Sequence, residues 1–169
     1  MFKSFKWVSL ITLLVLLTAC KAGVREPIEY QYRGEVYGVI DVKFTEDLAK
    51  KRKKYKDLKL ERRVRSELKK YNLFNEKSTN KIEILIDTIN FRSTVDAALL
   101  GSRAGSDVLE GQVSLIILKR KAYRKIHGFD VSATQSKGGP SNAIAKKRLK
   151  TLGQEFGKIT AKEILRKLN

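Results

Sequence analysis

The stretch KIEILIDTINF, residues 81–91, is the strongest β-strand pattern in the chain and decides the fold. Ile82, Ile84 and Ile86 recur at every second position, which places them on one face of an extended strand. A second apolar set should point to the opposite face: Leu85, Ile89 and Phe91. Because both faces are apolar, we expect this strand to lie in the interior of a sheet.

Three further stretches alternate in the same way. Residues 36–44 (VYGVIDVKF) predict a strand before the central one, and residues 108–118 predict a strand after it. The chain then turns at Lys119–Ala122 and returns over residues 123–134 as a hairpin partner. The returning strand should carry one apolar face, formed by Tyr123, Phe129, Val131 and Ala133.

Two stretches have helical periodicity instead. The first runs from Glu46 to Tyr71 and places Leu60, Val64 and Leu68 on one side. We expect a single helix there, which packs on the sheet.

The second helix should begin at Ser141 or Asn142 and end near Leu168, with a recurring apolar stripe. Its Gly153 and Gly157 lie four residues apart, one turn of helix. We expect them to permit a close approach of this helix to the sheet.

The predicted order is strand, helix, strand, strand, strand, helix. Two amphipathic helices on one face of a sheet give an α+β two-layer sandwich. We expect about four strands in a mixed or antiparallel sheet. The helix between the first two strands allows them to run parallel.

The chain begins with MFKSFKWVSLITLLVLLTAC, residues 1–20. Lys3 and Lys6 precede an apolar run from Val8 to Ala19, which is shorter than the ~20 residues that span a bilayer. These are the proportions of a signal peptide. A signal anchor with an incidental cysteine is the alternative.

The end of this segment, Leu17-Thr18-Ala19-Cys20, resembles the lipobox of bacterial lipoproteins. The resemblance implies that Cys20, the chain's only cysteine, is lipidated after removal of residues 1–19. Two or more acyl chains anchor a protein stably to a membrane. In lipoproteins of bacteria with two membranes, an Asp directly after the lipidated cysteine tends to retain the protein in the inner membrane. Residue 21 is a lysine, so the resemblance favours the outer membrane, with the domain facing the periplasm. Residues 20–35 would then form the lipidated cysteine and a flexible tether, and residues 36–169 a single domain.

The chain is strongly basic, with 36 Lys and Arg against 18 Asp and Glu. Loss of Lys3 and Lys6 lowers the formal charge from +18 to +16. Such a field attracts anions at long range. Two clusters are candidate anion-binding residues, although a solvated surface is the plainer interpretation of each: Lys50, Lys51, Arg52, Lys53 and Lys54, and Lys119, Arg120, Lys121, Arg124 and Lys125.

Catalytic signatures are missing from the sequence. It contains neither HExxH nor GxSxG, and no free thiol remains if Cys20 is lipidated. His127, the only histidine, has no carboxylates placed beside it for a metal site. We therefore expect no enzyme, no cofactor and no metal.

The layout of the mature chain also resembles a family of small bacterial envelope lipoproteins of unknown function. The resemblance rests on Val64–Phe74, Ile89–Arg92, Gly101–Gly105 and the hairpin that contains Val113–Leu115. At the level of architecture it is similar to outer-membrane lipoproteins that activate cell-wall synthases or assist lipopolysaccharide assembly. A fold-level likeness does not assign a function.

Two functions remain open from the sequence. The first is a membrane-anchored assembly or adaptor lipoprotein that binds an envelope protein partner. The second is an anion-binding lipoprotein that contacts lipopolysaccharide, cell-wall polymer or nucleic acid. No aromatic residues interleave the basic runs for base stacking, so we expect no specific nucleic-acid binding.

Overall fold

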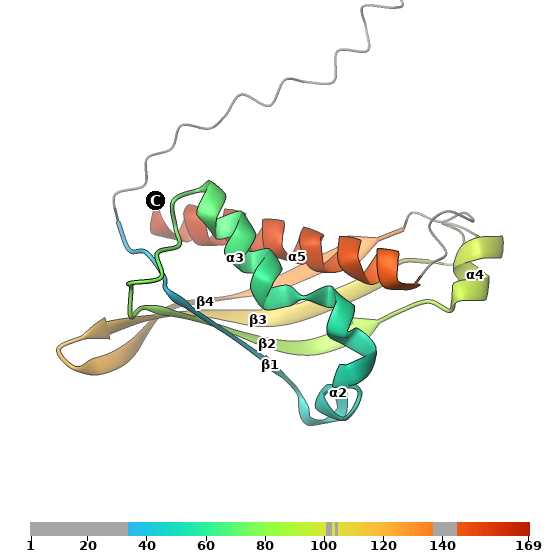
Figure 1. Cartoon of the computed structure of the whole chain (residues 1–169), viewed down its shortest axis with the longest axis horizontal. Helices are drawn as coiled ribbons and strands as arrows, with labels where there is room; N and C mark the ends of the chain where they lie inside the picture. The colour runs from blue at the N-terminus through green and yellow to red at the C-terminus, as the bar shows by residue number, and fades with distance from the viewer. Residues whose placement is uncertain (1–33, 101–102, 104, 137–144) are drawn as a thin grey trace, which may run out of the picture. The chain divides into compact units, whose positions relative to one another are not determined.

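The computed structural model describes residues 34–100, 103, 105–136 and 145–169. Its four-stranded sheet has the order β1-β2-β3-β4 (Figure 1). The strands are β1 (Val39–Phe44), β2 (Lys81–Asn90), β3 (Asp107–Lys119) and β4 (Ala122–Gln135). β1 and β2 are parallel, whereas β2–β3 and β3–β4 are antiparallel. The central position predicted for residues 81–91 is therefore confirmed.

Helices cover one face of this sheet. The main ones are α3 (Leu60–Lys70) and α5 (Ala145–Leu168), which pack against each other and against the strands (Figure 1). Between β1 and α3 lie α2 (Glu46–Lys50) and the 3₁₀ helix η1 (Arg52–Leu58), and α4 (Thr94–Leu99) follows β2. The predicted α+β sandwich with a mixed sheet is confirmed. The expected cap of the last helix, at Ser141 or Asn142, lies outside the described residues.

The prediction of one continuous helix from Glu46 to Tyr71 is wrong. α2 ends at Lys50 and η1 ends at Leu58; the next residue, Lys59, adopts the left-handed conformation with φ 47°. Like charges four residues apart disfavour an α-helix in this lysine-rich stretch. Tyr55 and Leu58, both buried, are three residues apart and share one side of a 3₁₀ helix, which has 3.0 residues per turn.

Strand β2 contains a bulge that changes which side chains face the core. Ile86 pairs with Gly111, but the next pair is Thr88 with Glu110, so Asp87 is an extra residue. Beyond the bulge, Ile89 pairs with Leu109 and packs with the core. The prediction that Ile89 and Phe91 lie on the face opposite Ile82, Ile84 and Ile86 is wrong: both pack against the same core.

Only Leu85 remains on the outer face from the second apolar set predicted for this strand. Its side chain is 39% exposed, and no described element covers that face of the sheet. The inference of two buried faces is therefore wrong for the described part of the chain, although the central position of the strand is right.

A second bulge, at Ile126 in β4, has the same effect. Leu115 pairs with His127 and Ile116 with Lys125. Val131 and Ala133 face the core as predicted, but Tyr123 moves to the outer face and is 61% exposed. A one-residue irregularity reverses every side chain beyond it.

The glycines of α5 do permit a close approach, but to another helical segment and not to the sheet. A Cβ atom on Gly153 would overlap the backbone carbonyl of Leu58, in η1. A Cβ on Gly157 would lie 3.1 Å from the backbone of Arg63, in α3. These two contacts hold η1 and α3 against α5.

Candidate functional site: a basic groove beside the edge strand

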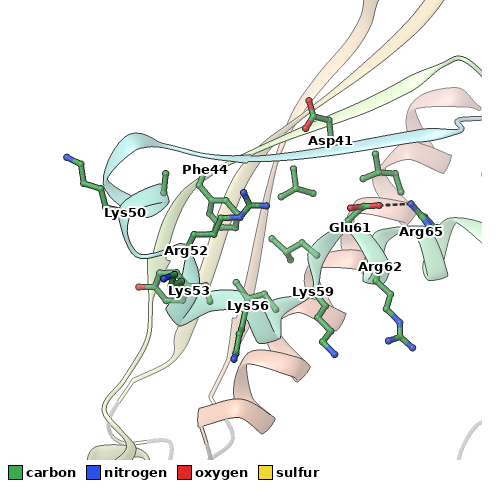
Figure 2. Close-up of a pocket in the computed structure, with 16 residues that line it drawn as sticks. Asp41, Phe44, Lys50, Arg52, Lys53, Lys56, Lys59, Glu61, Arg62 and Arg65 are labelled. Atoms are coloured by element: carbon green, nitrogen blue, oxygen red, sulfur yellow. Dashed lines mark hydrogen bonds and ion pairs between the residues drawn. The ribbon is translucent and has the colours of Figure 1, made fainter.

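A groove of ≈ 1130 Å³ lies between β1 and the η1–α3 segment. Figure 2 shows β1 along one side and η1 with the start of α3 along the other. Ile40, Val42 and Phe44 enter the groove from β1, and Leu58 and Leu60 enter it from the opposite wall. β1 is the last strand of the sheet. Val42 and Phe44 are half-buried at this edge, whereas Ile40, Leu58 and Leu60 are buried in the core.

Cationic side chains surround this apolar floor. The groove is lined by Lys50, Arg52, Lys53, Lys56, Lys59, Arg62 and Arg65, and by the carboxylates Asp41 and Glu61. Figure 2 shows Lys56, Lys59 and Arg62 pointing away from β1, toward solvent. The groove therefore combines an apolar interior with a positive rim.

The two carboxylates of the groove are already paired. Glu61 accepts a hydrogen bond from Arg65 at 2.5 Å, and Asp41 lies 3.3 Å from the ammonium of Lys43. Within the described part of the chain, five groove cations form no ion pair: Arg52, Lys53, Lys56, Lys59 and Arg62. The site is thus suited to a ligand that carries negative charge.

The first predicted anion-binding cluster only partly belongs to this groove. Lys50, Arg52 and Lys53 line it, whereas Lys51 does not. Lys54 borders a smaller cavity of ≈ 350 Å³, and its ammonium lies 5.8 Å from the ring centre of Tyr55.

The second predicted cluster lies at the tip of the β3–β4 hairpin, at the opposite end of the sheet from α2 (Figure 1). The two-residue turn is Arg120–Lys121, and both residues have positive φ, at 51° and 66°. The register places Arg124 beside Ile117 and Lys125 beside Ile116, on opposite faces of the sheet. The five exposed cations Lys119, Arg120, Lys121, Arg124 and Lys125 therefore form no single face, and the structure does not bring them to the groove.

Lys81, on the outer face of the sheet, is paired with an acidic side chain. Lys81 donates to Glu83 at 2.6 Å, and this hydrogen bond raises the pKa of Lys81 above its ordinary value. The same ammonium lies 5.6 Å from the ring centre of Tyr123. This lysine stays cationic and engaged within the sheet.

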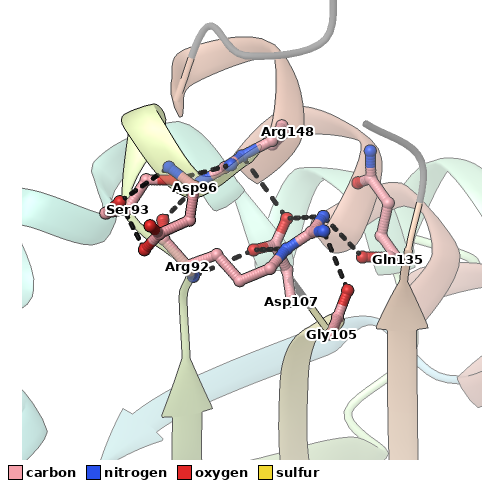
Figure 3. Close-up of polar contacts among 7 residues, drawn as sticks. All are labelled: Arg92, Ser93, Asp96, Gly105, Asp107, Gln135 and Arg148. Atoms are coloured by element: carbon pink, nitrogen blue, oxygen red, sulfur yellow. Dashed lines mark hydrogen bonds and ion pairs between the residues drawn. The ribbon is translucent and has the colours of Figure 1, made fainter. Parts of the chain in front are cut away.

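The opposite end of the sheet from the hairpin tip holds a buried ionic cluster of Arg92, Asp107 and Arg148 (Figure 3). Asp107 Oδ1 accepts from the backbone N–H of Arg92 at 3.1 Å and from its Nε at 3.2 Å. Arg148 Nε lies 3.4 Å from Asp107 Oδ2. Asp107 and Arg148 are fully buried.

Backbone carbonyls and a ring complete this cluster. Arg92 donates to the carbonyls of Gly105 and Gln135, at 2.8 and 3.2 Å. Arg148 donates to the carbonyl of Arg92 at 2.6 Å, and its guanidinium lies 4.2 Å from the ring centre of Phe91. The cluster ties the end of β2, the start of β3, the end of β4 and the first turn of α5 together. The role of the cluster is therefore structural.

Sequence reasoning missed both the ionic cluster and half of the groove. Arg92, Asp107 and Arg148 have no pattern that separates them from surface charges. Lys56, Lys59, Arg62 and Arg65 belong to the same basic stretch as Lys50–Lys54, so the length of the charge run was the available signal. Their gathering around an apolar groove depends on the break at Lys59.

No group of three or more His, Cys, Asp or Glu side chains in the described part of the chain could hold a metal ion. Over the same residues, no helix has the length and apolar character needed to cross a bilayer.

No family model matches the chain, and neither does any curated protein. Among solved structures, the chain is similar to a "putative lipoprotein from Caulobacter crescentus", with 19% identity and a TM-score of 0.39. The alignment covers 76% of this chain and 86% of that one. A likeness at this level carries no argument about function.

Proposed function

We propose that this chain is a non-enzymatic, membrane-anchored envelope lipoprotein whose domain acts as an assembly or adaptor module. Lipidation at Cys20 would hold the domain to the outer membrane, with residues 20–35 as the tether. The observation that carries the binding role is the groove beside β1. Half-buried apolar side chains within a charged rim are typical of a surface that receives another molecule.

A protein partner fits this groove better than a polyanion alone. Phosphate-rich polymers need cations but not an apolar floor, whereas the half-buried Val42 and Phe44 provide one. Burial of that floor would stabilise a complex by about 25 cal/mol per Å² of apolar surface. The cations would add orientation and a faster encounter.

The second candidate function is anion binding, and a specific observation favours it. Five groove cations have no carboxylate partner in the described part of the chain. Lipopolysaccharide, cell-wall polymer or nucleic acid would supply the missing negative charge.

Photo-crosslinking in isolated membranes tests the proposal. A photoreactive residue would replace Arg62 at the groove, and the matched control would replace Lys162, which is exposed on α5. Isolated membranes would then be washed at low and at high salt before irradiation. The proposal predicts one protein adduct from position 62, which survives high salt and is absent from position 162.

Salt separates the alternatives. Polyanion binding falls steeply as the salt concentration rises, because each contact releases counterions. A glycolipid or polymer adduct that high salt abolishes would support anion binding and contradict the adaptor role. A Cys20→Ala chain that stayed in the membrane at its normal mature mass would contradict the lipid anchor.

A further inference from the structure

We propose that the partner contributes an extended acidic segment, which adds to the sheet as a new strand along β1. This inference rests on the proposed function, since it names the class of partner that the groove receives. The added strand would form backbone hydrogen bonds with Ile40, Val42 and Phe44.

The hydrogen bonds between β1 and β2 show which backbone groups are available. Val39 N donates to Asn80 O at 3.2 Å, and Thr45 N donates to Ile86 O at 3.0 Å. Alternate residues of a parallel pair direct their N–H and C=O groups to the partner strand. The odd-numbered residues of β1 therefore face β2, and Ile40, Val42 and Phe44 direct their backbone groups to the open edge.

Just before β1, the backbone of Tyr37 pairs with the segment that follows α3. Tyr37 N donates to Leu73 O, and Asn75 N donates to Tyr37 O, both at 3.0 Å. These bonds form a parallel bridge between Tyr37 and Phe74. Beyond this bridge, no described strand pairs with the outer side of β1.

The groove continues this edge and has room for side chains. Strand β1 is six residues long, so a matching segment would extend about 20 Å at ~3.3 Å per residue. Alternate side chains of the added strand would face inward and contact the half-buried Val42 and Phe44. The occupant should therefore have apolar residues at every second position.

Charge complementarity makes the segment acidic. Arg52 and Lys53 line the groove without an ion-pair partner among the described residues, and Arg52 extends toward β1 beside Phe44 (Figure 2). Carboxylates that flank the apolar residues would meet these cations. A basic segment would be repelled, which adds specificity.

The other edge strand, β4, is a weaker candidate. Its bulge at Ile126 interrupts the regular ladder, and bulges are a common device against strand addition at an edge. β1 has no register irregularity between Val39 and Phe44.

Residue-resolved hydrogen exchange tests the proposal on the full-length lipidated protein in neutral detergent micelles. The probe is a synthetic peptide of alternating Val and Thr with two Glu at each end, at up to millimolar concentration. We expect it to slow exchange at the amides of Ile40, Val42 and Phe44 by about tenfold or more. Exchange at Asp41 and Lys43 should not change, because those amides already bond to β2.

Peptide controls separate strand addition from adhesion by charge. Two variants of the probe carry N-methyl groups on alternate amides, in opposite phases. Only one phase should abolish the protection, since only alternate amides face β1. Replacement of Glu by Gln should weaken binding. Val42→Pro removes one outward N–H, which an edge strand tolerates, and should also abolish the protection.

Three results would overturn the inference. The first is that millimolar peptide does not slow exchange at the three β1 amides, and the second is that both N-methylated peptides lose the protection equally. The third is that phosphatidylglycerol vesicles displace the peptide while exchange at the three amides is not slowed. If any of these occurs while position 62 still yields a salt-resistant protein adduct, the adaptor function stands and only strand addition fails. If that adduct is absent as well, the proposed function fails.

Discussion

The groove and the buried ionic cluster use the same chemical groups in opposite ways. In the cluster, two guanidinium groups and one carboxylate are buried and ringed by backbone carbonyls. In the groove, cations of the same kinds lie around an apolar floor, and five of them have no carboxylate partner among the described residues. In this protein, charged groups stabilise the fold where they are buried and paired. Where charge is exposed and unpaired, it is available for binding.

The largest expected effect is on the cluster. Asp107→Asn should lower the free energy of unfolding by about 3–5 kcal/mol, because two buried guanidinium groups lose their counter-charge. Urea unfolding at neutral pH measures this. Asp130→Asn, at an exposed position of β4, is the control and should change stability little. A loss below about 1 kcal/mol for Asp107→Asn would show that the carbonyls alone sustain the cluster.

A smaller loss is expected where α5 supports the wall of the groove. Gly153→Ala should destabilise the protein by about 1–3 kcal/mol, since the new Cβ overlaps the Leu58 carbonyl. Without that overlap, the same change in a helix would stabilise by up to ~1 kcal/mol. Thermal unfolding decides between the two signs. Gly157→Ala, where the nearest atom would be 3.1 Å away, should cost less.

The hairpin tip offers a gain in stability instead of a loss. Arg120 and Lys121 both occupy the left-handed region, which costs an ordinary residue about 1 kcal/mol or more. Asn–Gly is the preferred pair for such a turn. The double change Arg120→Asn, Lys121→Gly should raise the free energy of unfolding by about 1 kcal/mol. Unchanged or lower stability in a denaturant titration would mean that the cations of the tip compensate the strain.

The smallest expected effect on stability is in the groove. Each of Arg52→Glu, Lys53→Glu and Lys56→Glu should change the free energy of unfolding by no more than about 0.5 kcal/mol. With the photoreactive residue kept at position 62, the triple variant should nevertheless lose the crosslinked partner. A matched triple on α5, Lys146→Glu, Lys150→Glu and Lys162→Glu, changes the net charge equally at exposed positions and should retain it. Equal loss in both triples would point to bulk charge and not to the groove.

The sequence predicted the layers of the fold well, because alternation is a strong signal. The core positions Ile82, Ile84 and Leu115 follow directly from a period of two. Bulges at Asp87 and Ile126 leave no such signal, so the faces of Ile89 and Tyr123 could not be derived. The bulges depend on pairing with a distant strand, which a local pattern does not contain.

The candidate site was predictable only in part. The basic run predicted a surface that attracts anions. The left-handed conformation of Lys59 could not be predicted, because glycine or asparagine usually occupies such a position. That conformation separates η1 from α3 and places the cations along β1. Gly153 and Gly157 did signal a close contact, although the helical partner emerged only from the packing. The lipobox lies outside the described residues, and lipidation of Cys20 stays a prediction.

The most direct test of the open edge is amide hydrogen exchange in the unliganded protein. If the edge is open, exchange should alternate along β1, with fast exchange at Ile40, Val42 and Phe44 and slow exchange at Asp41 and Lys43. Slow exchange at all five amides would show that this edge is already covered. The groove would then be closed to a partner strand, which would contradict the account.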